Sequence, residues 1–249
     1  YRLSDFALDP IEEKGLSSEK ILRLPQSVFC FSPPQDAPDI EELAMVKTGW
    51  LTFGCFNQLA KLNEHVLELW VNIMQQISSS HLILKNAGFQ NEKNKQDIIN
   101  YFVSQGIEAE RIQCFSLTAS RTEHFSLYHQ MDIALDPFPF GGHITSLEAL
   151  WMGIPVITLQ GNTHFSRVTA SFLKILHLEE LIAHSLEEYL EITLEVAKDI
   201  TRLQRLHQTL REQLKTSPLC AGKQYLQAVE KFYRQIWQEW CHTQINLRL

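Results

Sequence analysis

The chain has 249 residues, of which 45% are hydrophobic and 20% charged, a composition typical of a folded globular protein and not of a disordered or fibrous one. Its formal net charge of −7, from 22 Lys and Arg against 29 Asp and Glu, leaves no basic footprint for counterion release, so we expect no nucleic-acid partner. No apolar run approaches the roughly 18 residues that span a bilayer, so we expect no membrane partner either.

Residues 1–49 are the least regular part of the sequence. Five prolines interrupt them, and the only run with strand character is Val28–Phe31. Ser32–Asp39 reads as a linker, because proline removes a backbone donor and holds the preceding residue in an extended conformation. The chain starts at Tyr1 without an initiator methionine, and we expect it to be a fragment of a longer protein.

From Trp50 onward, short apolar runs alternate with amphipathic segments. We expect strands at Trp50–Phe56, His81–Lys85, Arg111–Ser116, Asp132–Asp136 and Pro155–Leu159. We expect helices near Asn63–Gln76, Lys95–Gln105, Glu123–His129 and Thr145–Met152. This alternation predicts an α/β fold, a doubly wound, Rossmann-like parallel sheet covered by helices on both faces.

The chain after about Leu186 is helical in character. We expect helices at Glu187–Lys198, Ile200–Leu214 and Lys223–Trp240, with a break at Thr216–Leu219. The last helix carries an apolar stripe made of Leu226, Val229, Tyr233, Ile236 and Trp240. A stripe of this kind indicates packing against another part of the protein.

Doubly wound sheets bind ligands beyond the carboxyl ends of their strands, and the first polar loop there is Phe56–Lys61. Asn57 and Gln58 can donate amide hydrogen bonds, and Lys61 supplies a positive charge for a phosphate. The alternative is an ordinary polar loop, in which the asparagine caps a helix and the lysine lies in solvent.

The second polar loop is Thr118–His124, after the third predicted strand. Arg121 and His124 could flank a planar base, with the imidazole stacking on it. The alternative is a helix start capped by Ser120 or Thr122, and the two interpretations are compatible.

The third loop, within Asp136–Leu159, has the clearest chemistry. Two glycines, the second of them Gly142, precede His143 and a predicted helix, so backbone N–H groups and the helix N-terminus can approach phosphate oxygens. The hydroxyls of Thr145 and Ser146 can donate as well. Glu148 shares the helical face of Thr145 and can accept hydrogen bonds from ribose hydroxyls. The alternative is a capping box, because T-S-L-E fits the S/T-x-x-E pattern.

The cysteines and histidines give no sign of a metal centre. The five cysteines are far apart in the sequence and form no C-x-x-C pair, which favours reduced thiols in a cytoplasmic protein. The remaining histidines lack ligand spacing, and D-I-A-L-D (Asp132–Asp136) is not a D-x-D motif. His164 and Arg167, after the fifth strand, could close over a ligand, although a structural role at a helix start is the stronger interpretation.

Several long motifs follow one another in a fixed order over nearly the whole chain. They are Phe53–Lys61 (F-G-C-F-N-Q-L-A-K), the block Asp136–Leu159, S-R-V at Ser166–Val168 and Y-R-Q-I-W at Tyr233–Trp237. In this order they resemble the C-terminal catalytic region of the protein O-linked N-acetylglucosamine transferases and the related plant-type protein O-fucosyltransferases.

The resemblance implies a GT-B architecture, in which two Rossmann-like domains face each other across a cleft. Residues 1–49 would be the tail of the preceding catalytic domain plus a linker, residues 50–222 the nucleotide-sugar domain, and residues 223–249 a C-terminal helix packing back on the N-terminal half. That half, and helical repeats before it, would belong to the full-length protein. The general base is not assigned, and the fragment alone is not expected to be fully active.

The implied reaction is an inverting, metal-independent transfer of N-acetylglucosamine from UDP-N-acetylglucosamine to Ser or Thr hydroxyls of an acceptor protein, with no cofactor. By resemblance, Lys61 would contact the diphosphate and stabilise the leaving group, with Gln58 beside it. His143, the backbone of Ile144 and Thr145 would surround the phosphates.

The same resemblance assigns the nucleoside. His124 would stack on the uracil, Ala119 and Arg121 would line the base pocket, and Glu148 would bind the ribose. Two positions depart from the family pattern: Ile144 stands where a hydroxyl residue is common, and Glu148 replaces an Asp of some members.

Three alternatives remain open from the sequence. The same fold could use another donor, GDP-fucose or UDP-glucose. The chain could also be a nucleotide-sugar-binding module without catalysis, or an epimerase of related fold.

Overall fold

The structure is a computed structural model that describes residues 1–11 and 17–246. Its centre is a six-stranded sheet in the order β5-β4-β3-β6-β7-β8, in which every neighbouring pair is parallel. The strands are β3 (Thr52–Cys55), β4 (His81–Lys85), β5 (Ile112–Phe115), β6 (Ile133–Leu135), β7 (Val156–Leu159) and β8 (Ile182–Ala183). The predicted doubly wound sheet is therefore confirmed. The short β8 was not predicted, because two residues give no periodicity to detect.

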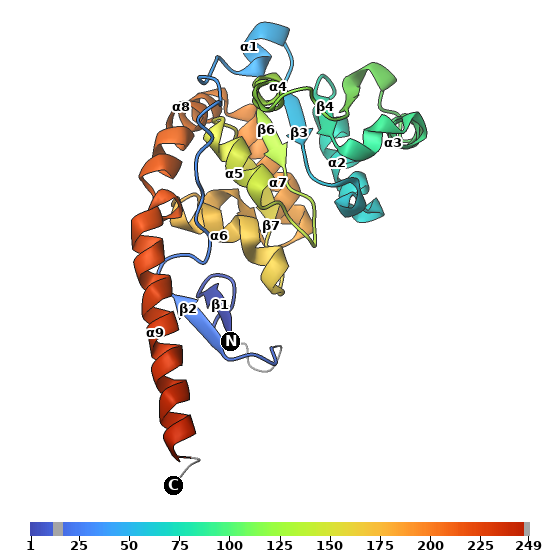
Figure 1. Cartoon of the computed structure of the whole chain (residues 1–249). Coiled ribbons are helices and arrows are strands. Elements are labelled where there is room, and N and C mark those ends of the chain that lie inside the picture. The colour runs from blue at the N-terminus through green and yellow to red at the C-terminus, as the bar shows by residue number, and fades with distance from the viewer. Residues whose placement is uncertain (12–16, 247–249) are drawn as a thin grey trace.

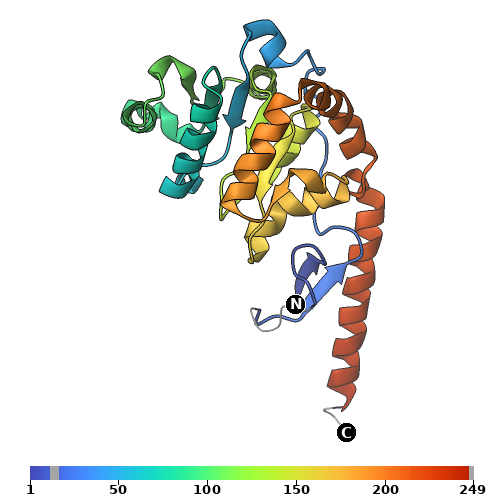
Figure 2. The same ribbon diagram turned by 180° about the vertical axis from the view of Figure 1, so that it is seen from behind.

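Helices cover both faces of the sheet (Figures 1 and 2). They include α2 (Glu64–Gln76), α3 (Glu92–Ser104), α4 (Arg121–Ser126), α5 (Ile144–Trp151), α6 (Val168–Ile175), α7 (Leu186–Lys198) and α8 (Ile200–Thr216). All but α6 lie within a few residues of the predicted positions, and the predicted helix near Glu123–His129 divides into α4 and a 3-10 turn, Leu127–Gln130. The alternating strands and helices thus fold as the apolar pattern indicates.

Burial explains these elements. All four residues of β3 are buried, as expected for a central strand covered on both faces. Asn63 caps α2 by accepting a hydrogen bond from the backbone N–H of Val66, and the helix buries Leu67 and Trp70 on one face. Helix α2 packs beside α7, and α5 beside α8.

The strand order places the switch of direction between β3 and β6. The chain steps outward from β3 through β4 to β5, then returns to build β6, β7 and β8 on the other side. At such a point the loops after the two central strands diverge and leave a crevice at their carboxyl ends.

The predicted strand at Val28–Phe31 is wrong. The strands of this region are β1 (Arg2–Asp5) and β2 (Ile21–Leu24), a separate parallel pair. The backbone N–H of Val28 donates to the Asp5 carboxylate, and that of Phe31 donates to the carbonyl of Leu219. Because these donors are taken by a side chain and a distant loop, the apolar run packs without joining a sheet.

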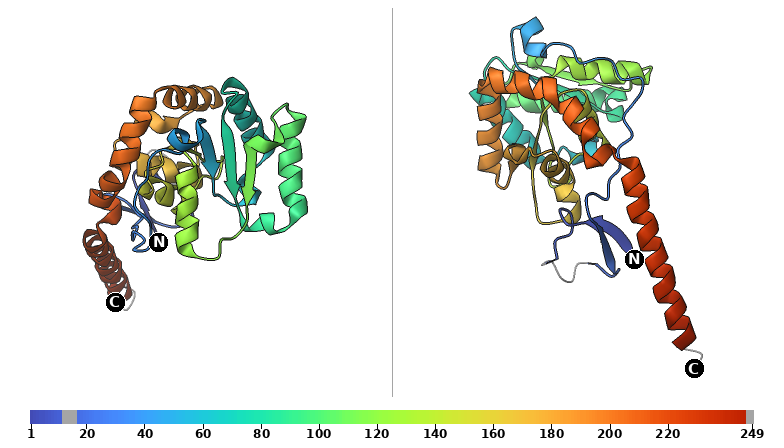
Figure 3. Two further views of the ribbon diagram at one scale, coloured as in Figure 1. Left: turned by 90° about the horizontal axis from the view of Figure 1, so that it is seen from above. Right: turned by 90° about the vertical axis from the view of Figure 1, so that its left-hand side faces the viewer.

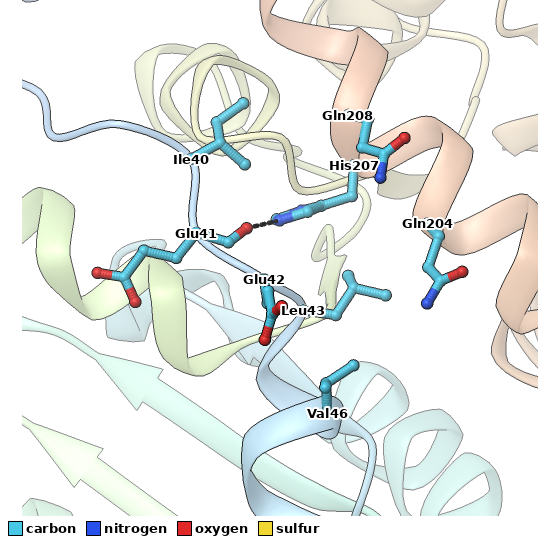
Figure 4. A pocket seen from close by; sticks show the side chains of 8 residues that line it. All are labelled: Ile40, Glu41, Glu42, Leu43, Val46, Gln204, His207 and Gln208. Carbon is cyan, nitrogen blue, oxygen red and sulfur yellow. Dashed lines mark hydrogen bonds between the residues drawn. The ribbon is translucent and has the colours of Figure 1, made fainter.

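The predicted linker lies beside α8 and is held there by hydrogen bonds. The Arg211 guanidinium donates to the carbonyls of Pro38 (2.8 Å) and Trp151 (2.6 Å). The ring of His207 lies between the carbonyl oxygens of Glu41 (2.8 Å) and Gly153 (2.9 Å), beside a cavity of about 670 Å³ (Figure 4). A short helix that the sequence did not predict, α1 (Ala44–Thr48), then leads into β3.

The C-terminal helix α9 (Gly222–Asn246) extends beyond the sheet and its helices, alongside β1 and β2 (Figures 1 and 3). Near its far end, Glu239 accepts hydrogen bonds from Lys20 (2.9 Å) and Tyr1 (3.2 Å). Most of its apolar stripe is uncovered: Leu226, Tyr233 and Trp240 are 56%, 62% and 52% exposed.

Residues 12–16 and 247–249, which fall in the predicted segments 1–49 and 223–249, lie outside the described residues. Within the described part of the chain, no helix combines the length and apolarity needed to cross a membrane.

Candidate functional site

A cavity of about 470 Å³ opens at the carboxyl ends of β3 and β4 and at the start of α5. Four segments line it: the loop after β3, the end of β4, the loop after β5, and the loop between β6 and α5. The lining residues are Phe56, Asn57, Gln58, Lys61, Lys85, Asn86, Ala87, Ser116, Leu117, Phe140, His143, Ile144 and Thr145. Three predicted phosphate contacts, Lys61, His143 and Thr145, are therefore brought to one cavity.

Lys61 ends the 3-10 turn Leu59–Lys61 and reaches across the crevice. Its Nζ donates to the carbonyl of Gly141 (2.6 Å) and to Asn57 Oδ1 (3.3 Å), and lies 4.5 Å from the centre of the Phe140 ring. Burial lowers the pKa of Lys61, and the charge of Asp136 opposes that effect. The alternative of a solvent-exposed lysine is excluded, and a half-buried ammonium at this place would gain from an anionic ligand.

Asn57 does not cap a helix. Its Oδ1 accepts from Lys61 and from the hydroxyl of Thr145 (3.1 Å), and the side chain is buried. The predicted role of Asn57 as an amide donor to a ligand is replaced by a supporting one, in which it joins the loop after β3 to the start of α5. Gln58 lines the cavity and its side chain makes no capping bond.

The glycine turn after β6 is shaped by Asp136. Its carboxylate accepts from the backbone N–H of Gly142 (2.6 Å) and from the hydroxyl of Thr158 (2.8 Å). Burial raises the pKa of Asp136, while hydrogen bonds from Thr169 and Thr158 and the charge of Lys61 lower it. A Cβ on Gly142 would clash with the hydroxyl of Ser146, so glycine is required for this close approach.

Helix α5 begins at Ile144, directly after His143. Its first N–H groups have no partner within the helix and carry the positive end of the helix dipole, on the side that lines the cavity. The ring of His143 packs against Phe29 (4.5 Å between centroids) and Phe172 (5.9 Å), and burial lowers its pKa. Ile144 is 51% exposed and presents no side-chain donor.

The predicted alternative of a capping box over Thr145–Glu148 is not what the structure contains. The Thr145 hydroxyl donates to Asn57, and the Glu148 carboxylate bonds to His124. The Ser146 hydroxyl, expected as a possible donor to a ligand, bonds to Thr169 in the buried interior.

His124 and Glu148 form a pair next to the cavity lining. His124 Nε2 lies 3.0 Å from Glu148 Oε2, and its Nδ1 lies 2.7 Å from Nζ of Lys85. The rings of Phe56 and Tyr128 flank the imidazole, at 6.0 and 5.5 Å between centroids. Lys85, which lines the cavity, connects the pair to it.

Two predicted residues of the base pocket are not among the lining residues. The Arg121 guanidinium lies 3.7 Å from Asp36 and 5.5 Å from the centre of the Phe125 ring, and its side chain is mostly exposed. The backbone N–H of Ala119 donates to Glu123. Ser120 caps α4 by accepting from the N–H of Glu123, so the helix-start interpretation of this loop is confirmed.

Sequence reasoning missed Lys85, Asn86 and Phe140 as lining residues. Lys85 is the last residue of a correctly predicted strand, and its place at a carboxyl end was an available signal. Phe140 gave no signal, since an aromatic next to a glycine turn is usually core.

Of the two interpretations of His164 and Arg167, the structural one is correct. His164 Nδ1 lies 2.8 Å from Asp9, and the buried Arg167 donates to the carbonyl of Leu8 (2.8 Å). They join the N-terminal segment to the sheet domain rather than covering the cavity. Within residues 1–11 and 17–246, no three His, Cys, Asp or Glu side chains gather as a metal site would require.

The family model for glycosyl transferase family 41 matches residues 45–229. A curated relative from Petunia hybrida, described as a probable UDP-N-acetylglucosamine–peptide N-acetylglucosaminyltransferase SPINDLY, is 36% identical over 97% of this chain and 26% of its own length. A second relative, from Arabidopsis thaliana, is described as a probable UDP-N-acetylglucosamine–peptide N-acetylglucosaminyltransferase SEC. It is 28% identical over 98% of this chain and 26% of its own length. The chain therefore spans about a quarter of the length of these relatives.

Solved structures agree with the fold. That of a Thermobaculum terrenum O-GlcNAc transferase mutant has a TM-score of 0.88 and 33% identity, and the match covers 97% of this chain and 45% of that one. A sucrose-phosphate synthase from Thermosynechococcus elongatus shares the fold alone. Its TM-score is 0.61 at 14% identity, and the match covers 88% of this chain and 53% of that one.

Proposed function

Because the chain belongs to glycosyl transferase family 41, we propose that it forms the donor-binding half of an enzyme that transfers N-acetylglucosamine from UDP-N-acetylglucosamine to Ser or Thr hydroxyls of proteins. The relatives described as peptide N-acetylglucosaminyltransferases support this reaction and this donor. The acceptor site and the general base would lie in the part of those longer proteins that this chain does not span. The proposed compartment is the cytoplasm.

One observation carries the proposal: Lys61 and the first turn of α5 line the same cavity at the switch point of the sheet. The leaving group of the transfer is a nucleoside diphosphate, which gains negative charge as the sugar departs. A half-buried ammonium and the N–H groups of His143–Thr145 are fixed in advance and would stabilise that charge. Such an arrangement would allow the proposed metal-independent, inverting transfer.

The nucleoside would lie toward Lys85 and His124. In the proposal the His124 ring stacks on the base, Glu148 accepts from the ribose hydroxyls, and Ala119 and Arg121 border the base. Gly142 leaves room for the phosphates, with Gln58 beside them. The described geometry supports the pairing of His124 with Glu148, at 3.0 Å.

Titration calorimetry with UDP, GDP and their sugars tests the proposal. We expect UDP to bind the wild-type chain, and Lys61→Ala to weaken UDP binding at least ten-fold, because a charge-assisted contact to the diphosphate is lost. Lys93→Ala, a change of an exposed lysine on α3, serves as the control and should bind UDP as the wild type does. Preference for GDP would instead favour a fucose donor. Equal UDP binding by Lys61→Ala and wild type would remove Lys61 from the site.

A further inference from the structure

We infer that Lys85 is a positioning residue for the nucleoside half of the site: it fixes His124 in the tautomer that carries its proton on Nε2 and donates it to Glu148. The inference rests on the proposed function for its ligand, but the tautomer itself is a property of the unliganded protein.

Three side chains from three different elements form a continuous chain of contacts. Lys85 is the last residue of β4, His124 lies in α4 and Glu148 in α5. Lys85 Nζ lies 2.7 Å from His124 Nδ1, and His124 Nε2 lies 3.0 Å from Glu148 Oε2. Both distances lie within hydrogen-bonding range, and each bond has one charged partner.

The donor and acceptor roles follow from the chemistry of the two ends. An ammonium has three N–H donors and no acceptor, so Nδ1 of His124 must be the unprotonated, accepting nitrogen. The neutral ring then carries its proton on Nε2, and this N–H donates a hydrogen bond to the carboxylate of Glu148. A doubly protonated ring would place an N–H against the ammonium, and the opposite tautomer would leave Nε2 without a proton to donate to Glu148.

The surroundings of the ring make this arrangement rigid. The side chains of His124 and Glu148 are 18% and 12% exposed. The rings of Phe56 and Tyr128 pack near the imidazole, at 6.0 and 5.5 Å between centroids. Burial lowers the pKa of Lys85, and the charge of Glu148 opposes the shift.

The consequence concerns the base and the ribose. With both ring nitrogens engaged, the imidazole cannot rotate, and the ring face offered to a base stays in place. Glu148 Oε2 accepts the hydrogen bond from Nε2–H of His124, so the carboxylate is held where it can accept from a ribose hydroxyl. Lys85 thus prepares two nucleoside contacts at once, in the way that outer hydrogen bonds orient the ligands of a metal.

Lys85 also lines the cavity, so it could instead bind a phosphate directly. Uridine and UDP separate the two roles, because uridine has no phosphate. For a positioning residue, the loss of affinity in Lys85→Met is the same for both ligands, roughly ten-fold, as expected for losing a hydrogen bond from a charged group. For a phosphate ligand, UDP binding falls and uridine binding does not change.

Nitrogen-15 NMR of histidine-labelled protein reads the tautomer without any ligand, and His124→Gln identifies the resonances. We expect the wild type at neutral pH to show an unprotonated Nδ1 and a protonated Nε2. Lys85→Met should shift both resonances toward averaged values, and Lys85→Arg, which retains donors, should largely restore the wild-type pattern. Lys93→Ala, the exposed lysine on α3, is the control: it should leave UDP binding, uridine binding and the His124 resonances unchanged.

Three results would overturn the inference: a proton on Nδ1 in the wild type, identical His124 resonances in wild type and Lys85→Met, or loss of UDP binding alone in Lys85→Met. If neither UDP nor uridine binds the wild type while the expected tautomer is present, the proposed function fails and the role of Lys85 in holding the ring stands.

Discussion

Single buried carboxylates control the geometry around β6. Asp132 precedes the strand and accepts from the backbone N–H groups of Met45 (3.0 Å) and Thr52 (2.8 Å), while Asp136 follows it and shapes the glycine turn. Both acids were predicted as strand ends rather than metal ligands, and both lie at the ends of β6. The carboxylates of Asp132 and Asp136 connect loops to the sheet.

Asp132 predicts a pH dependence of stability. Burial raises its pKa from 3.8 to about 6, with the two N–H donors and His207 opposing the shift. A raised pKa means that the folded state favours the protonated acid. The resulting contribution to the free energy of unfolding is therefore full below about pH 4 and is lost as the pH rises to about 6. The increase in pKa corresponds to about 3 kcal/mol of unfolding free energy. Urea unfolding from pH 4 to 7 should show this loss in the wild type.

Asp132→Asn provides the comparison for that measurement. The variant should be less stable overall, since an amide accepts at only one of its two heavy atoms, but its free energy of unfolding should lack the fall between pH 4 and 6. Parallel curves for the two proteins would show that Asp132 does not titrate in this range.

A substitution at Ile144 is expected to increase the affinity for UDP. The residue lines the cavity, is 51% exposed, and offers no side-chain hydrogen bond to a ligand. Ile144→Thr keeps the β-branched shape and adds a donor, so UDP should bind several-fold more tightly with a change in stability of about 0.5 kcal/mol or less. Ile144→Val is the matched control and should leave the dissociation constant unchanged. Unchanged binding in both would show that the diphosphate does not reach this side chain.

The residues of the site were only partly readable from the sequence. Lys61, His143 and Thr145 could be chosen because each occupies a strand-end loop or a helix start. Asn57 could not be separated from a helix cap, since a side-chain amide suits both environments. The position of Lys85 against His124 depends on how β4 packs beside α4, which no local pattern encodes.

At the scale of elements, the start of α5 is the critical feature. Gly142→Ala would place a Cβ against Ser146 and 2.9 Å from Asp136 Oδ1, two buried groups that are already hydrogen bonded. We expect a loss of about 1–3 kcal/mol in the free energy of unfolding and at least ten-fold weaker UDP binding, because the helix start must move. Gly222→Ala, whose Cβ would be at ordinary contact distance from Cys30, should change neither quantity appreciably. Wild-type affinity in Gly142→Ala would show that the turn tolerates the shift.

Element prediction succeeded where burial and periodicity agree, as in α2 and β4. It failed at Val28–Phe31, an apolar run of which only Phe31 is fully buried and whose backbone donors go to Asp5, Ser27 and Leu219. Strand propensity reports a buried extended segment and does not report the partner of its hydrogen bonds. The strand β1 was missed because its four residues, R-L-S-D, include one apolar residue, and β2 (I-L-R-L) is interrupted by Arg23.

On the scale of the whole molecule, α9 leaves two stacked tryptophans uncovered. Trp237 and Trp240 have ring centroids 5.2 Å apart and are 63% and 52% exposed. In the proposed two-half enzyme this face would pack on the preceding half. Changing both to Ser should leave the unfolding of this chain within about 0.5 kcal/mol of wild type, and should lower the melting temperature of the longer protein.

Gln238→Ala, on the exposed side of the same helix, is the control for both lengths of protein. Equal melting temperatures for the tryptophan variant and the wild type in the longer protein would mean that these two tryptophans do not contact the preceding half.

Hydrogen bonds along the N-terminal segment limit how such an enzyme could move. The bonded pairs are Arg167 with Leu8, Leu219 with Phe31, Arg211 with Pro38, and His207 with Glu41. These points are distributed along the segment, and each joins it to the sheet or to the helices around it. A hinge that closes one half of the enzyme over its ligand would therefore have to flex outside the stretch from Phe31 to Glu41, which would move together with the sheet.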